Sequence, residues 1–183
     1  MNSGFSLKDG SSANIQRGRK KDNGLKMRGF FTIEVIREGK VIHKERVRNA
    51  IVNVGLDYAL SVALDGGSQI GNWYIGLVDN AGWSGFNASD TMASHGTWSE
   101  LQSYDETTRP EWAPDAPSGQ TISNSVAVTF TINATETIKG VFITSNSTKG
   151  GTTGTLWATA GFTSTIPVAS TDVLKVTYAV VAT

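Results

Sequence analysis

The chain has 183 residues, enough for one domain of ordinary size with a tail, and one hydrophobic core is expected. Cysteine is absent and only two histidines are present, which excludes disulfides and zinc sites of ordinary composition, so we expect neither a metal nor a cofactor. No apolar run approaches the roughly 18 residues of a membrane span, and the first residues lack the apolar core of a secretion signal, so no membrane contact is expected.

The net charge of zero conceals a basic first quarter and an acidic remainder. Residues 1–50 carry twelve Lys or Arg side chains against five carboxylates, a net charge of +7, and the other residues carry four against eleven, which gives −7. Such a division predicts contacts between copies of the chain, or between the basic end and another negative partner. The alternative is a solvated tail whose charges have no partner.

Residues 1–27 are rich in Ser, Gly, Asn and Lys and contain few apolar side chains, chiefly Phe5, Leu7, Ile15 and Leu25. This composition predicts a flexible basic N-terminal arm that orders against a neighbouring subunit, followed by a single β-rich domain over residues 28–183. Nucleic acid is not the expected partner, because the arm lacks interleaved aromatic residues and any nucleic-acid fold signature. The candidate partner-binding cations are Arg17, Arg19, Lys20, Lys21, Lys26 and Arg28.

A β-hairpin is predicted over residues 29–47, where apolar and polar side chains alternate around a turn at residues 37–40 that contains Gly39. One short helix should follow, since apolar residues up to Leu64 recur at helical spacing. Gly55 and the β-branched residues before it place the start of this helix near Leu56.

Four of the five tryptophans fall within residues 71–112, among Gly, Asn, Ser, Asp and Thr. After a strand at residues 72–78, this composition predicts a long ordered loop, the tryptophan-rich loop, with one short helical turn capped by Ser89 or Asp90. Its large aromatic rings either pin the loop to the core or anchor a partner, and a platform for carbohydrate is a third possibility. The rings concerned are Trp83, Trp98 and Trp112.

Four further strands are predicted at residues 121–134, 136–146, 155–164 and 172–182, with Val126 on the same face as Val128 and a break at residues 166–167. Seven short strands rich in Val, Thr and aromatic residues predict a mainly β chain. The fold expected is a β-sandwich or barrel-like domain of about seven strands with one short helix.

Residues suited to catalysis are few. His95 lies near Ser94 and Asp90, but the chain has no nucleophile elbow, and we expect this histidine to hydrogen-bond within the loop. His43 is expected on the surface. The neighbouring carboxylates at residues 105–106 do not have calcium-binding spacing, so we interpret them as a solvated acidic loop. We therefore expect no enzymatic activity and no catalytic residue.

The order of these segments resembles small structural proteins of tailed-bacteriophage virions, most closely the auxiliary capsid proteins called decoration or cement proteins. The segments that carry the resemblance are FFTIEVIREGKVIHKERVRN, NAIVNVGLDYAL, NWYIGLV, DTMASHGTWSE, TRPEW, SNSVAVTFTI, TIKGVFI and GTLWATAGF. The resemblance implies a non-enzymatic protein on the capsid surface of the virion, assembled in the host cytoplasm and present in many copies. Its implied partners are the major capsid protein and neighbouring copies of itself, for which a trimer is one arrangement.

Two alternatives stay open. The first is a phage tail, neck adaptor or fibre-anchoring protein, since such proteins carry similar β-domains. The second is a carbohydrate-binding module that would bury a sugar on rings of the tryptophan-rich loop.

Overall fold

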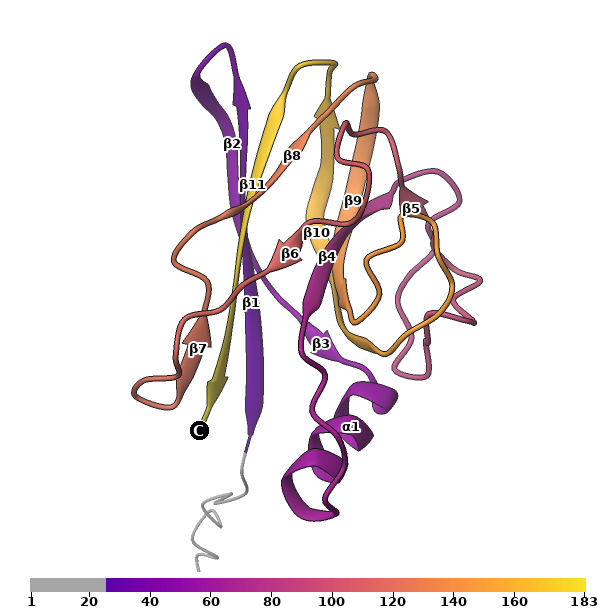
Figure 1. Cartoon of the computed structure of the whole chain (residues 1–183). Helices are drawn as coiled ribbons and strands as arrows, with labels where there is room; N and C mark the ends of the chain where they lie inside the picture. The colour runs from indigo at the N-terminus through magenta and orange to yellow at the C-terminus, as the bar shows by residue number, and fades with distance from the viewer. Residues whose placement is uncertain (1–25) are drawn as a thin grey trace, which may run out of the picture.

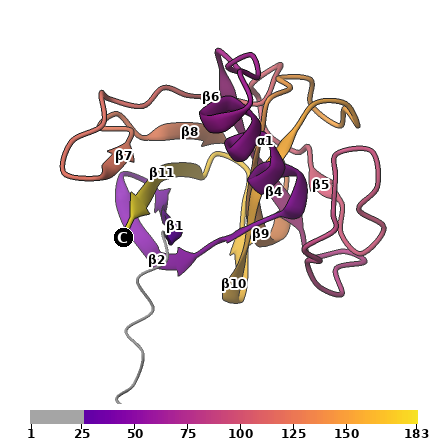
Figure 2. The same ribbon diagram turned by 90° about the horizontal axis from the view of Figure 1, so that it is seen from below.

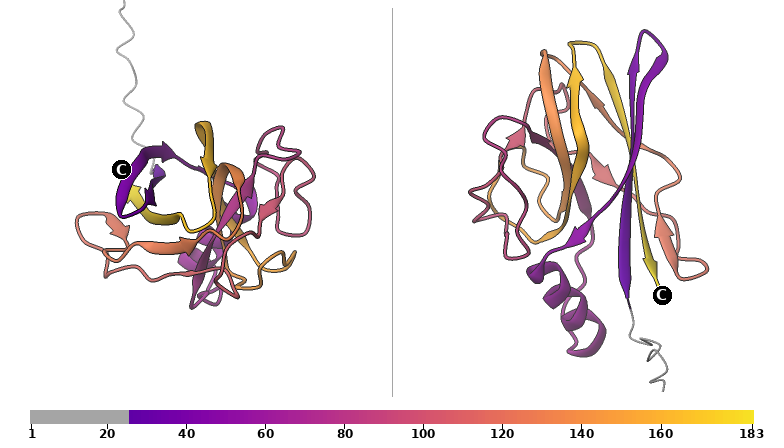
Figure 3. Two further views of the ribbon diagram at one scale, coloured as in Figure 1. Left: turned by 90° about the horizontal axis from the view of Figure 1, so that it is seen from above. Right: turned by 180° about the vertical axis from the view of Figure 1, so that it is seen from behind.

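The computed structural model describes residues 26–183. The segment 1–25, which contains Arg17, Arg19, Lys20 and Lys21 of the predicted arm, lies outside the described residues. Residues 26–183 form two antiparallel sheets that pack face to face, with one helix at the end of the sandwich (Figures 1 and 3). No helix within residues 26–183 is long and apolar enough to cross a membrane.

The first sheet places β11 beside β1, and β1 beside β2; two short strands, β7 and β8, pair with the other edge of β11. Its strands are β1 (Met27–Arg37), β2 (Lys40–Arg48), β7 (Thr121–Ser123), β8 (Val128–Thr131) and β11 (Val173–Ala182). The second sheet has the order β3, β10, β9, β4, with β5 and β6 both paired to β4. Its strands are β3 (Ala50–Ile51), β4 (Trp73–Asp79), β5 (Glu100–Leu101), β6 (Glu111–Trp112), β9 (Glu136–Thr144) and β10 (Leu156–Val168).

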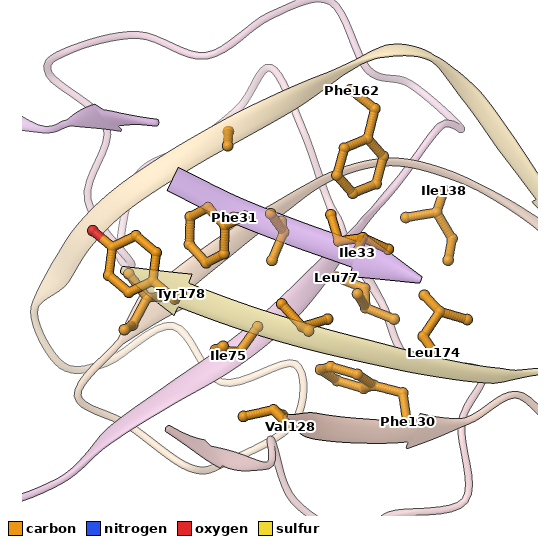
Figure 4. Packing of buried hydrophobic residues seen from close by; sticks show 14 of the residues in the cluster. Phe31, Ile33, Ile75, Leu77, Val128, Phe130, Ile138, Phe162, Leu174 and Tyr178 are labelled. Carbon is orange, nitrogen blue, oxygen red and sulfur yellow. The ribbon is translucent and has the colours of Figure 1, made fainter. Parts of the chain in front are cut away.

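The core fills the space between the two sheets. Alternate residues of β1 point inward, so that Phe31, Ile33 and Val35 are completely buried, and the inward side chains of β4 and β11 meet them (Figure 4). Burying an apolar side chain of this size contributes about 1.5–3 kcal/mol. The predicted β-sandwich with one short helix is therefore confirmed.

The N-terminal hairpin is confirmed, with register running from Phe30 opposite Arg48 to Arg37 opposite Lys40. Its two-residue turn has positive φ at Glu38 (50°) and Gly39 (75°), as the twist of a hairpin requires. A bulge after Val35 shifts the register near the turn.

The helix α1 (Asn53–Leu64) begins three residues before the predicted start at Leu56. Gly55 does not delay it, because this glycine packs directly on β10: a Cβ atom there would lie 2.4 Å from the backbone oxygen of Trp157. The absent side chain is therefore what lets the first turn of α1 approach the sheet.

Two predictions in the C-terminal half are wrong. The strand predicted over residues 121–134 is divided into β7 and β8, because the Asn124 side chain turns inward and bonds to the backbone of β11, which leaves Val126 exposed between them. The break predicted at residues 166–167 does not occur, and Pro167 pairs with Thr137 within β10. Proline is tolerated there because β3 pairs with β10 only at residues 158–159, so that no strand of the described residues pairs with that edge of β10 beside Pro167.

Candidate binding surfaces

The tryptophan-rich loop, between β4 and β6, packs against the outside of the second sheet. Trp98, Met92 and Phe86 form a second apolar cluster with Phe142 of β9 and Val78 of β4. This packing explains why residues 75–78 of β4 are buried on both faces.

The short helical turn predicted in this loop is wrong. Residues 91–94 form a tight turn in which the backbone groups of Thr91 and Ser94 bond each other in both directions. The Asp90 carboxylate, instead of capping a helix, accepts hydrogen bonds from the backbone N–H of Asn87 (2.9 Å) and from Nε1 of Trp98 (2.9 Å). This carboxylate fixes the position of the Trp98 ring.

The three candidate tryptophans differ in exposure. Trp98 and Trp112 are buried, and Nε1 of Trp112 donates to Oδ1 of Asn124 at 3.0 Å. Trp83 is half-buried, with Nζ of Lys139 4.8 Å above the centre of its ring. In this structure Trp98 and Trp112 pin the loop to the sandwich, and of the three only Trp83 keeps appreciable exposed surface.

A buried arginine holds the returning part of the loop. The Arg109 side chain is fully buried, and its Nε and Nη2 donate to the two carboxylate oxygens of Glu100 at 2.9 and 2.7 Å. The remaining donors bond the backbone oxygens of Asn146 (2.9 Å) and Gly151 (2.8 Å), in the turn between β9 and β10. We call these four residues the arginine clasp, and they join residues 100–109 of the loop to the turn between β9 and β10, about forty residues later in the chain.

The turn between β9 and β10 closes over the same loop. Nζ of Lys149 donates to the backbone oxygen of Tyr104 at 2.7 Å, and the backbone N–H of Gly150 donates to Glu100 at 2.7 Å. Burial raises the pKa of the Tyr104 phenol above its ordinary value, because removal from water disfavours the charged form. The glycine-rich composition of residues 147–154 predicts a hairpin turn here, but sequence reasoning missed its contacts with the loop and the burial of Arg109, since neither belongs to a recognisable motif.

The side chains considered for chemistry have structural partners. His95 stacks on Trp98 at 4.0 Å, and its Nδ1 lies 3.1 Å from the Trp98 backbone oxygen, which confirms the predicted hydrogen bond within the loop. His43 is half-buried beside Glu45, not fully on the surface. Within residues 26–183 no three metal-ligating side chains come together.

The carboxylates at residues 105–106 are more engaged than predicted. Glu106 accepts from the backbone N–H of Thr131 at 3.0 Å, and Asp105 accepts from Nδ2 of Asn133 at 3.1 Å. They hold the loop to the end of β8.

The outer face of the first sheet is basic. Alternation along the paired strands places the outward side chains of β1, β2 and β11 in rows, with Glu34 between Lys44 and Lys175. Lys44 bonds Glu34 at 2.7 Å and lowers the pKa of that carboxyl group. We call this surface the basic face; its cations are Arg28, Lys44, Arg46, Arg48 and Lys175.

The base of the predicted arm adjoins this face. The backbone of Lys26 pairs with that of Thr183 in both directions (2.7 and 2.8 Å), beside the start of β1. Arg28 lies two residues further along, opposite Val181 of β11. Of the predicted partner-binding cations, Lys26 and Arg28 are thus brought to the edge of the basic face, where the chain passes to residues 1–25.

Comparison with known proteins adds no identification. No protein-family model matches the chain, and no curated protein matches it.

Proposed function

We propose that this chain is a non-enzymatic structural protein of a tailed-phage virion, which binds the assembled capsid and stabilises it. A protein that binds only the assembled shell raises the resistance of that shell to disassembly by its binding free energy. The proposed partners are the major capsid protein and neighbouring copies of the chain, on the outer surface of the virion.

The basic face is the observation that supports this proposal. Five cations and one carboxylate project from the hydrogen-bonded strands β1, β2 and β11, which hold them in fixed rows. Because the strands are already ordered, only the side chains of these cations have to be ordered when they meet a negative surface. The partner that fits is therefore a broad acidic protein surface.

The arm extends the same charge. Residues 1–25 add Lys8, Arg17, Arg19, Lys20 and Lys21 against Asp9 and Asp22. We propose that the cations of the arm, together with Lys26 and Arg28, contact the shell beside the basic face and enlarge the contact area.

Neutralising the basic face tests the proposal. The triple variant Arg28→Gln/Arg46→Gln/Lys175→Gln should bind empty capsids about 5- to 100-fold more weakly than the unaltered chain at roughly 0.15 M salt, because each lost surface contact is worth a few tenths to about 1 kcal/mol. The measurement is cosedimentation of full-length protein with purified empty capsids over a range of salt concentrations.

Lys40→Gln is the control, and the capsid affinity of this single variant is compared with that of the single variant Lys175→Gln. Lys40 is an exposed cation at the tip of the β1–β2 hairpin, away from the rows of the basic face. It should leave capsid binding within about twofold of the unaltered chain, while Lys175→Gln weakens it measurably. Equal affinity of the triple variant and the unaltered protein would contradict the proposal.

Neither alternative function gains a specific observation. A carbohydrate-binding module needs exposed aromatic faces, and two of the three candidate rings are buried, those of Trp98 and Trp112. A tail, neck or fibre-anchoring protein would use the same fold in fewer copies per virion.

A further inference from the structure

The helix α1 lies at one end of the sandwich, beyond the ends of the strands of the second sheet (Figures 1 and 2). Much of its apolar surface is not covered by the described residues. Only Gly55 of its twelve residues is fully buried. Leu56, Leu60 and Leu64 are 42%, 59% and 82% exposed, and their spacing of four residues aligns them along one side of the helix. We call these three side chains the leucine ridge.

A groove of about 540 Å³ runs beside the ridge, and Leu56 and Leu60 form one of its walls. The opposite wall comes from the start of β1 and from the connection of β2 through β3 to α1. We call it the end groove; its remaining lining residues are Met27, Arg48, Asn49, Ala50, Ile51 and Ala59.

The ridge borders the groove, and both are mostly apolar. Leu56 and Leu60 belong to both, Leu64 continues the ridge past the groove, and six of the eight residues that line the groove are apolar. Rows of side chains four residues apart are the ridges that helices insert into the grooves of their neighbours. Two copies related by a two-fold axis would bury two ridges in two grooves at once.

The charges at this end are also complementary. Arg48 is the one cation that lines the end groove, and Asp57 lies on α1 one position after the first leucine of the ridge. Neither forms a salt bridge within residues 26–183. In a two-fold pair, the Asp57 carboxylate of each copy would face the Arg48 guanidinium of the other.

We propose that the leucine ridge and the end groove form an interface between two copies of this chain. Contiguous exposed apolar surface of this kind marks interaction sites, and among possible occupants the chain itself supplies both halves of the fit. This interface does not require the capsid, so it can be tested without it and can fail independently of the proposed function.

Sedimentation equilibrium of the full-length protein tests the interface. The unaltered chain should form dimers, and Leu64→Glu should raise the dissociation constant at least about tenfold, because it places a charge in an apolar contact. Val126→Glu is the matched control: Val126 is also 82% exposed but lies between β7 and β8, and its substitution should leave dimerisation unchanged.

Exchanging the charges of Arg48 and Asp57 tests whether these two side chains meet across the interface. Arg48→Asp and Asp57→Arg should each weaken dimerisation, because each brings like charges together, and the double variant should restore it. Circular dichroism of each variant shows whether it is folded.

Three results would overturn the proposal. The first is a monomer at all accessible concentrations, and the second is association that Leu64→Glu does not weaken. The third is association that is lost in Phe5→Ala/Leu7→Ala/Ile15→Ala while the double variant Arg48→Asp/Asp57→Arg associates no better than either of its single variants, which would assign the groove to residues 1–25 instead.

Discussion

Arg109→Met is expected to lower the free energy of unfolding by about 3–5 kcal/mol, because it leaves a buried carboxylate without its cation. The Glu100 side chain is only 6% exposed, and each of its two carboxylate oxygens accepts a hydrogen bond from the Arg109 guanidinium group. The backbone oxygens of Asn146 and Gly151 would also lose their donor. Urea denaturation followed by tryptophan fluorescence measures the change.

Lys44→Met is the control that tests whether the loss of stability depends on the burial of the ion pair. Its salt bridge to Glu34 has the same 2.7 Å separation as that of Arg109 to Glu100, but Lys44 is 63% exposed. An exposed pair contributes about 0–1 kcal/mol, so this variant should stay near the stability of the unaltered chain. If Arg109→Met cost no more than Lys44→Met, the arginine clasp would not hold the tryptophan-rich loop.

Tyr178→Phe is expected to cost about 2–4 kcal/mol, because two buried donors lose one shared acceptor. The Tyr178 hydroxyl oxygen accepts from Nδ2 of Asn49 (2.8 Å) and from Nε1 of Trp157 (2.9 Å), which ties β11 to the connection between β2 and β3 and to β10 of the second sheet. The substitution keeps the ring that stacks on Phe31, so the loss measures the hydroxyl alone. Thermal unfolding by calorimetry gives the difference.

Tyr74→Phe removes a hydroxyl of the same kind from β4. Tyr74 is only half-buried, and its hydroxyl has no hydrogen bond to another residue of the described chain, so its loss should change stability by less than about 0.5 kcal/mol. Similar losses for the two variants would mean that the buried network around Tyr178 adds little to stability.

The parts of the fold that follow local patterns could be predicted from the sequence. Apolar and polar residues alternate along β1, and the hairpin turns at Glu38-Gly39, so both the hairpin and the inward face of β1 could be predicted. The end of α1 could be predicted as well, because glycine commonly follows the end of a helix at positive φ, and Gly66 does so here (68°). β9 and β11 also fall where the composition places them.

The contacts of the tryptophan-rich loop could not be predicted in the same way. Arg109 sits in a segment with the composition of a surface loop, and its burial depends on backbone oxygens about forty residues later in the chain. Asn124 breaks the predicted strand for a similar reason, since its amide satisfies β11 and Trp112. Such contacts are set by tertiary packing, for which a single sequence carries no local signal.

The basic face could be predicted from the sequence in part. The excess of cations in residues 1–50 was evident, and the alternation of the hairpin places Lys44 and Arg46 on its outer side. Lys175 joins them only because β1 pairs with β11, a pairing between the two ends of the domain. The charge was therefore predictable, and its arrangement into one surface was not.

The proposed capsid role is tested most directly by the copy number and position of this chain in purified virions, measured by quantitative mass spectrometry together with electron microscopy. A capsid-stabilising protein should be present in hundreds of copies, spread over the shell with the basic face turned towards it. A dozen copies or fewer, confined to one vertex, would contradict that account and assign the chain to the neck or tail.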